Sequence, residues 1–173
     1  MRIIFILFTF IFFASETSAQ QNFTQKDFNK LKILSEDWLI QSSNNIYEEW
    51  EVLNDSTIKG LRYDIIDTIY VLGAEMTLSY SNREIKISYN FIEVNNIKGK
   101  DNILHLKSIK KNEYFFNNDA AEIISSEERK NNSEKICTRH FFNFQEKDKI
   151  KATNMHINPE KGLSTEIYLY VKK

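Results

Sequence analysis

Three side chains suited to acid–base or ligand chemistry, Glu48, His140 and His156, stand in segments where apolar and polar residues alternate. A β-strand places alternate side chains on opposite faces, so each group shares a face with the residues two positions away. This phasing predicts three inward-facing sets: Ile46, Glu48, Trp50 and Val52 in residues 45–53; Ile136, His140, Phe142 and Phe144 in residues 136–144; and Ile150, Ala152, Asn154 and His156 in residues 149–157. Because a buried polar group is costly without a partner, we expect these groups to bind one another, water or a ligand.

Three interpretations of this arrangement are open. In the first, the polar groups satisfy one another within a filled core. In the second, they are the polar contacts of a ligand cavity, whose predicted binding residues are Glu48, Trp50, Met76, Tyr89, His140, Phe142 and His156. In the third, Glu48, His140 and His156 form a metal or acid–base site, although their spacing across strands is not a motif.

The other reactive side chains carry weaker signals. Cys137 alternates with Arg139, so we expect its thiol near the surface, and His105 shares its phase with Lys107 and is expected on the surface. The sequence contains no glycine-rich phosphate loop, no paired-cysteine metal motif and no serine nucleophile elbow. We therefore expect no cofactor and no metal, and we place an enzyme third among the possible functions.

Strands must position these groups, and their pattern is clearest in residues 84–92, where Ile85, Ile87, Tyr89 and Phe91 alternate with polar residues. Residues 70–80 form a long alternating set before it, and Ser81-Asn82 is predicted to join the two as a tight hairpin. Further strands are predicted at 37–42, 45–53, 57–65, 102–109, 113–117, 136–144, 149–157 and 163–171. The strongest turn signals are at 54–56 and 158–162.

Helix signals are few. Thr24 followed by Asp27 predicts an N-terminal cap, and Phe23 can pack on Phe28, so we expect a short helix over residues 24–34. Residues 119–130 are ambiguous, with a slight preference for a second short helix.

Short strands joined by tight turns predict a mostly β fold: an antiparallel up-and-down barrel of about 8–10 strands with an N-terminal helix. The alternative is a β-sandwich.

The first nineteen residues predict export. Met1-Arg2 is followed by the apolar run from Ile3 to Ala14, and small residues at Thr17 and Ala19 suit cleavage after Ala19. The run is too short for a membrane-spanning helix, which takes about 20 apolar residues. We therefore expect a signal peptide at 1–19, one domain at 20–173 and no transmembrane anchor after cleavage. We expect the mature protein to be periplasmic or extracellular, in a Gram-negative bacterium.

Composition limits the partners. The formal net charge is −1, which lacks the basic excess typical of nucleic-acid binding. Cys137 is the single cysteine, so the domain has no internal disulfide and depends on packing. The sequence leaves the oligomeric state open.

A series of short motifs resembles a known family. Trp38-Leu39, Tyr47-Glu48-Glu49-Trp50, Gly60, Glu75-Met76-Thr77-Leu78 and Ile87-Ser88-Tyr89 are similar to a family of small exported bacterial barrels, lipocalin-like, that carry only a domain-of-unknown-function label. The similarity runs from Leu34 to Phe91 and resumes at Lys149 to Tyr170. The family's His-Asp-Phe-Pro element is missing, because the corresponding stretch is Phe115 to Ala121. The resemblance implies a lipocalin-like barrel.

Together these observations predict an exported binding module that holds a small apolar or amphipathic ligand. The alternative is a non-catalytic envelope or interaction protein with a filled core.

Overall fold

The computed structural model describes residues 22–36, 38–42, 46–92, 102–118, 136–146, 148–158 and 162–172. The predicted signal peptide, the ambiguous segment at 119–130 and most of the turn at 158–162 lie outside the described residues.

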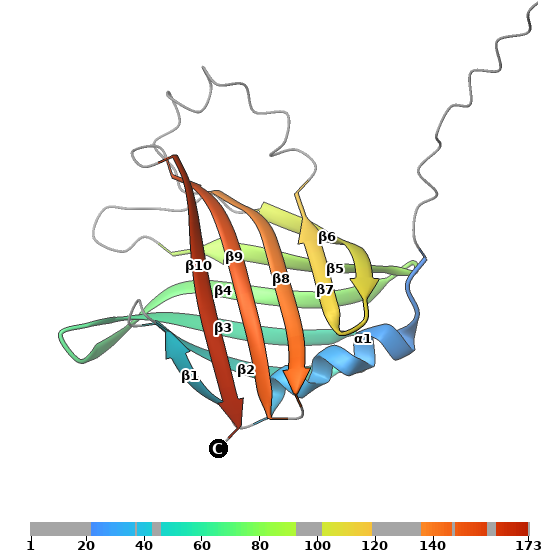
Figure 1. Cartoon of the computed structure of the whole chain (residues 1–173), viewed down its shortest axis with the longest axis horizontal. Helices are drawn as coiled ribbons and strands as arrows, with labels where there is room; N and C mark the ends of the chain where they lie inside the picture. The colour runs from blue at the N-terminus through green and yellow to red at the C-terminus, as the bar shows by residue number, and fades with distance from the viewer. Residues whose placement is uncertain are drawn as a thin grey trace, which may run out of the picture.

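One antiparallel sheet forms most of the described chain (Figure 1). Its strands are β1 (Trp38–Ser42), β2 (Ile46–Asn54), β3 (Thr57–Ile66), β4 (Ile69–Ser81), β5 (Glu84–Phe91), β6 (Asn102–Lys110), β7 (Glu113–Asn117), β8 (Ile136–Glu146), β9 (Lys149–Asn158) and β10 (Gly162–Lys172). Strands β2 to β10 follow one another as an up-and-down meander, and β1 returns to pair with β10. The predicted strands are confirmed to within two residues at each end.

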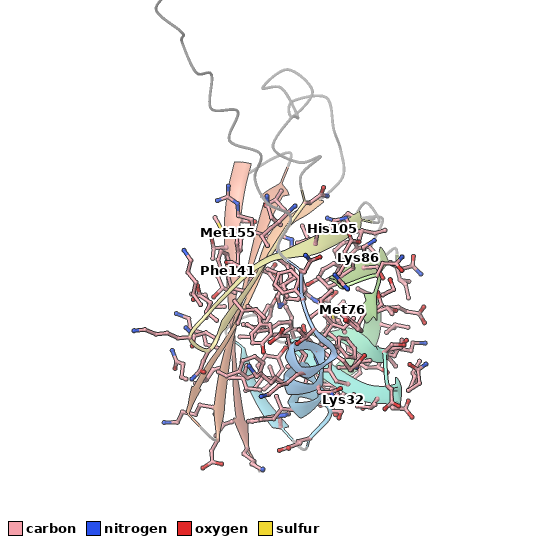
Figure 2. All side chains as sticks on the ribbon, turned by 90° about the vertical axis from the view of Figure 1, so that its right-hand side faces the viewer. Lys32, Met76, Lys86, His105, Phe141 and Met155 are labelled. Carbon is pink, nitrogen blue, oxygen red and sulfur yellow. The ribbon has the colours of Figure 1, made fainter. Side chains whose placement is uncertain are left out.

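The sheet curls on itself into a half-barrel. In Figure 1, β8, β9 and β10 cross in front of β2 to β5 at a steep angle, and Figure 2 shows side chains filling the space between these two layers. β1 and β2 are the two edges of the sheet, and among the described residues no backbone ladder joins them. The prediction of a mostly β, up-and-down antiparallel fold with an N-terminal helix is confirmed.

The tight turns use left-handed backbone conformations. Asn82 and Arg83 have φ of 52° and 62°, as a two-residue hairpin between right-twisted strands requires. The turn lies one residue later than the predicted Ser81-Asn82, because Ser81 still pairs with Glu84 in the β4–β5 ladder.

Helix α1 (Gln25–Leu31), continued by the 3-10 turn η1 (Lys32–Ser35), covers one end of the half-barrel. Thr24 caps α1 in a reciprocal capping box with Asp27, as predicted. The helix is held against the turns at that end, because the backbone N–H of Phe23 donates to Arg83 (2.9 Å) and Gln25 Nε2 donates to Asp55 (2.6 Å). No helix in the described part of the chain is long and apolar enough to span a membrane.

The interior changes character along the strands. Near α1 it is apolar, with Phe28, Leu31, Leu34, Ile58, Leu78, Ile85, Ile87 and Ile150 all buried. Towards the opposite end, buried polar side chains stand among the apolar ones: Arg62, Asn117, His140, Asn154 and His156. The helix therefore covers the apolar end of the half-barrel, and the buried polar side chains lie towards the other end.

A β-bulge in β8 corrects one prediction. Cys137 pairs with His156 and Arg139 pairs with Met155, so Thr138 is an extra residue in the strand. The bulge moves Cys137 to the inner face, where it is fully buried (0% exposed), and the expected surface position was wrong. His105 does face outward between the buried Leu104 and Leu106, and it is partly exposed.

Candidate functional site

The predicted polar groups do share the interior of the half-barrel. Glu48, His140 and His156 are 6%, 2% and 0% exposed, and Asn154 is buried beside them. The predicted apolar wall residues Met76, Tyr89 and Phe142 are buried as well, while Trp50 is partly buried and packs edge-on against Phe142 at 6.3 Å. The side chain of Ile136 lies outside the described residues. The period-two phasing is therefore confirmed on β2 and β9, and on β8 only after the bulge, from His140 onward.

Glu48 anchors the side of the site nearest the sheet edge. Its carboxylate accepts hydrogen bonds from Trp50 Nε1 (3.2 Å) and from the Tyr170 hydroxyl, so it joins β2 to β10. Burial raises the pKa of Glu48, whereas Arg62, opposite it on β3, and the two hydrogen bonds act in the other direction. This side-chain link closes the gap that the backbone ladder leaves between the sheet edges.

Glu166 organises a second group. Arg62 forms an ion pair with it at 3.1 Å, His156 Nε2 lies 3.0 Å from the same oxygen, and the Tyr168 hydroxyl donates to it. The Arg62 guanidinium also lies over the Tyr168 ring, 5.4 Å from its centre. Buried charges are tolerated when they are paired in this way.

His140 forms a third group, with Tyr89 and Asn154. The Tyr89 hydroxyl and His140 Nδ1 are 2.6 Å apart, and Asn154 faces His140 in the β8–β9 ladder. Burial lowers the pKa of His140 to about 3, with His156 and Arg62 acting in the same direction and Asn154 against it. The imidazole is therefore neutral at physiological pH.

His140 and Asn154 leave polar atoms unsatisfied. Among the described residues, neither His140 Nε2 nor either polar side-chain atom of Asn154 makes a hydrogen bond of good distance and angle, although Asn154 lies near enough to His140 to oppose the lowering of its pKa as a hydrogen-bond partner. Both residues are at least 98% buried, so solvent at the protein surface does not supply the missing bonds. We call His140, Asn154 and Tyr89 the unsatisfied cluster.

Sequence reasoning missed Arg62, Glu166, Tyr168 and Tyr170. A signal was present, because Arg62 is in phase with the inward Ile58 and Gly60, and Glu166, Tyr168 and Tyr170 alternate along β10. Applying the phasing to these two strands places all four residues inside.

The metal or acid–base interpretation gains no geometric support. Glu48, His140 and His156 have different partners, namely Tyr170 and Trp50, Tyr89, and Glu166. In the part of the chain that the structure describes, no three His, Cys, Asp or Glu side chains are arranged to hold a metal ion.

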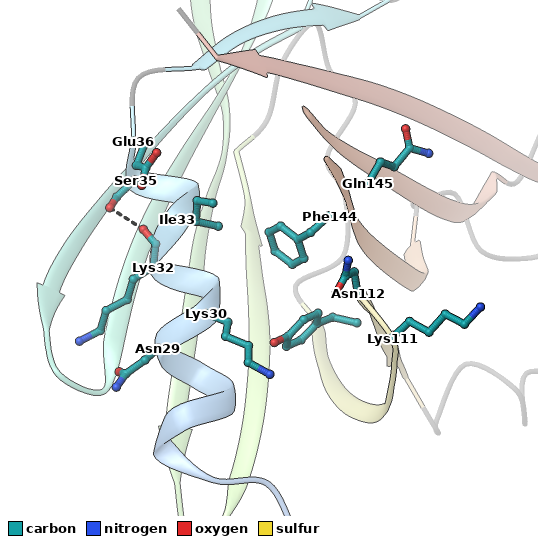
Figure 3. Close-up of a pocket in the computed structure, with 11 residues that line it drawn as sticks. Asn29, Lys30, Lys32, Ile33, Ser35, Glu36, Lys111, Asn112, Phe144 and Gln145 are labelled. Atoms are coloured by element: carbon teal, nitrogen blue, oxygen red, sulfur yellow. Dashed lines mark hydrogen bonds between the residues drawn. The ribbon is translucent and has the colours of Figure 1, made fainter. Parts of the chain in front are cut away.

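A groove lies elsewhere, on the outside of the half-barrel. It has a volume of about 920 Å³ and separates α1 and η1 from the β6–β7 turn and the end of β8 (Figure 3). Tyr114, Phe144 and Ile33 form its apolar part, and Lys30 and Lys111 lie at its rim. None of the predicted site residues lines this groove.

Known protein families, curated proteins and solved structures show no match to this chain, so the case for a function rests on the geometry of its interior.

Proposed function

We propose that this chain is an exported, lipocalin-like binding module that holds a small, largely apolar ligand inside the half-barrel. The ligand's polar group, a hydroxyl or an amide, pairs with His140 and Asn154. The short apolar run at the N-terminus supports export, and the curled antiparallel sheet with a helix at one end is the architecture in which barrels hold small ligands.

The unsatisfied cluster carries this proposal. A buried polar group without a partner costs about 1–3 kcal/mol, and this cluster has unsatisfied atoms on two residues from neighbouring strands. A bound molecule that supplies the missing hydrogen bonds recovers that free energy. Well-formed ligand sites have this composition, with a few convergent polar groups between apolar walls.

The chemistry of the cluster narrows the ligand class. Burial raises the pKa of Tyr89 well above its ordinary value, and His140 is neutral, so neither brings a charge to the cluster. His140 Nε2 is a donor in one tautomer and an acceptor in the other, and the Asn154 amide offers both functions. A hydroxyl or amide group, which also both donates and accepts, fits either tautomer.

Trp50 fluorescence tests the proposal. The W38F variant leaves Trp50 as the single tryptophan, and its contact with Phe142 makes it sensitive to changes in the interior. We expect saturable quenching on titration with medium-chain alcohols or primary amides. The response should be weaker in E48A and lost in N154L. The N143L variant, which removes an asparagine from the outer face of β8, is the matched control and should respond like its parent.

The filled-core alternative draws on a different observation. Arg62 and His156 Nε2 both pair with Glu166, as expected of a packed polar core in an interaction protein. This alternative predicts that no apolar probe changes Trp50 fluorescence, and that N154L and N143L behave alike. Either result would refute ligand binding by the unsatisfied cluster.

A further inference from the structure

A second cavity lies at the gap between the sheet edges. It has a volume of about 230 Å³, and it opens where the edge of β2 faces η1, β1 and β10. We call it the seam pocket, and its lining residues are Leu34, Ser35, Glu36, Trp38, Tyr47, Glu48, Glu49, Trp50 and Tyr170.

We propose that the seam pocket binds a small organic cation, an alkylated ammonium group. Four of its lining side chains are aromatic (Trp38, Tyr47, Trp50 and Tyr170), three are carboxylates (Glu36, Glu48 and Glu49), and none is basic. Aromatic faces attract cations through the ring quadrupole. Tyr47 and Trp50 are the partly exposed rings of the lining, whereas Trp38 and Tyr170 are buried behind them. Neighbouring carboxylates add attraction for a cation and repel anions.

The carboxylates of the seam pocket are only partly neutralised by basic side chains. Glu36 is held by Lys172 at 2.8 Å, so one carboxylate is already neutralised. Glu48 and Glu49 receive hydrogen bonds from Tyr170 and Tyr47, and within the described ranges no Lys or Arg lies within ion-pair distance of either. Burial raises the pKa of Glu48, and Arg62 lies opposite it on β3, so the carboxylate whose charge a bound cation would compensate is that of Glu49.

The size and position of the pocket favour a headgroup. Drug-sized ligands occupy cavities of about 300–1,000 Å³, so this volume suits a headgroup rather than a whole amphiphile. Tyr47 and Glu49 alternate with the inward Glu48 on β2, so the pocket spans both faces of the edge strand. A chain attached to the ammonium group can then extend outward past Glu49.

This proposal is separate from the proposed function, because the seam pocket shares Glu48 and Trp50 with it but includes no residue of the unsatisfied cluster. The two can fail independently. If choline does not bind but apolar probes still quench Trp50 fluorescence, only the seam-pocket proposal is overturned. If choline binds but no apolar probe quenches Trp50 fluorescence, only the proposal of an internal ligand site is overturned.

Calorimetric titration of the full mature chain tests the seam pocket. The probes are tetramethylammonium and choline, compared at constant ionic strength with 3,3-dimethylbutan-1-ol, the neutral isostere of choline. We expect saturable choline binding at least about tenfold tighter than that of the isostere, which is the discrimination expected of a charge-dependent site. Equal binding of choline and the isostere, or no saturable binding of either cation, would overturn the proposal.

Two pairs of variants localise the binding. E49Q should weaken choline binding about fivefold, whereas E51Q, which removes the same charge from the next exposed position on β2, should leave it unchanged. Y47L should weaken binding and Y47F should retain most of it, because phenylalanine keeps the aromatic face. Equal effects of E49Q and E51Q would show general charge attraction instead of a site. Circular dichroism confirms that each variant is folded.

Discussion

At the residue scale, Gly60 decides where the Trp50 ring lies. Gly60 pairs with Trp50 in the β2–β3 ladder, and a Cβ added there would lie 2.7 Å from the Trp50 ring. Contacts this short force a side chain to move, and overpacking of this kind costs about 1–3 kcal/mol. We expect G60A to lower the free energy of unfolding by that amount in urea denaturation and to change Trp50 emission.

Gly73 provides the matched control. A Cβ at Gly73 would approach the Asp64 carboxylate at 2.6 Å, but that carboxylate ends a flexible, partly exposed side chain that can move aside. G73A should therefore cost less than G60A and leave Trp50 emission unchanged. If both variants cost the same, the close packing of Trp50 on Gly60 is not what makes glycine necessary.

His140 should make stability depend on pH. Its pKa is lowered to about 3 in the folded protein from an ordinary value of 6.5, so the unfolded chain binds the proton first as pH falls. The free energy of unfolding is therefore unaffected by His140 above about pH 6.5. Between pH 6.5 and pH 3 it falls as the unfolded chain takes up this proton, by up to about 1.4 kcal/mol per pH unit.

The comparison of H140F with the wild type isolates this contribution. Denaturation at several pH values should show that the free energy of unfolding falls less steeply between pH 6.5 and 3 in H140F than in the wild type. H105F, which removes an outward-facing histidine, is the control and should follow the wild type. Equal acid slopes in H140F and the wild type would contradict a buried, neutral His140.

The sequence predicted individual site residues well where alternation is regular. Glu48, His140, Asn154 and His156 are buried as expected, because each shares a strand face with large apolar residues. Cys137 was misplaced because a bulge inserts one residue and reverses the phase, and no turn residue or glycine marks that position. The partners of each polar group were not predictable, because they depend on strands far apart in the sequence, such as β3 and β10 in the Arg62–Glu166 pair.

At the scale of elements, the β8 bulge controls thiol reactivity. It turns Cys137 into the interior, and Cys137 is the single cysteine of the chain. We expect native protein to react with a thiol reagent such as dithiobis-nitrobenzoate far more slowly than unfolded protein, at a rate that rises with denaturant as opening increases. Reaction in native buffer as fast as in the unfolded chain would place the thiol outside.

The cap of α1 makes a separate contribution. Thr24 accepts from the Asp27 backbone N–H, and Asp27 returns a bond to the Thr24 backbone, so T24A removes one side of a capping box. The expected cost is about 1 kcal/mol, which lowers the melting temperature by a few degrees. D27N, which keeps the side chain's size and an acceptor, should cost less. An unchanged melting temperature in T24A would show that α1 is held by packing alone.

Element positions were predictable because period-two alternation and turn residues are local signals. The pairing of β1 with β10 is what the predicted barrel requires, whereas the missing ladder between β1 and β2 among the described residues was not predictable, since it leaves no local mark. The seam pocket was not predictable for a similar reason, because its lining residues come from η1, β1, β2 and β10, which are far apart in the sequence.

At the scale of the whole molecule, the half-barrel has one end closed by an apolar plug and another end lined with polar groups. α1 packs Phe28 and Leu31 into the closed end, and this region stabilises the fold. Arg62, His140, Asn154 and His156 gather towards the other end. If the proposed function holds, substitutions of His140 and Asn154 are expected to change binding more than folding, whereas removing one member of the Arg62–Glu166 ion pair is expected to destabilise the fold as well.

The most direct measurement is the long-range ¹H–¹⁵N NMR spectrum of the His140 imidazole during titration with a medium-chain alcohol or primary amide. Ligand binding in the unsatisfied cluster predicts a saturable shift of the Nε2 resonance, absent in N154L and preserved in N143L. An Nε2 resonance that stays fixed at saturating concentrations of every probe would contradict ligand binding inside the half-barrel.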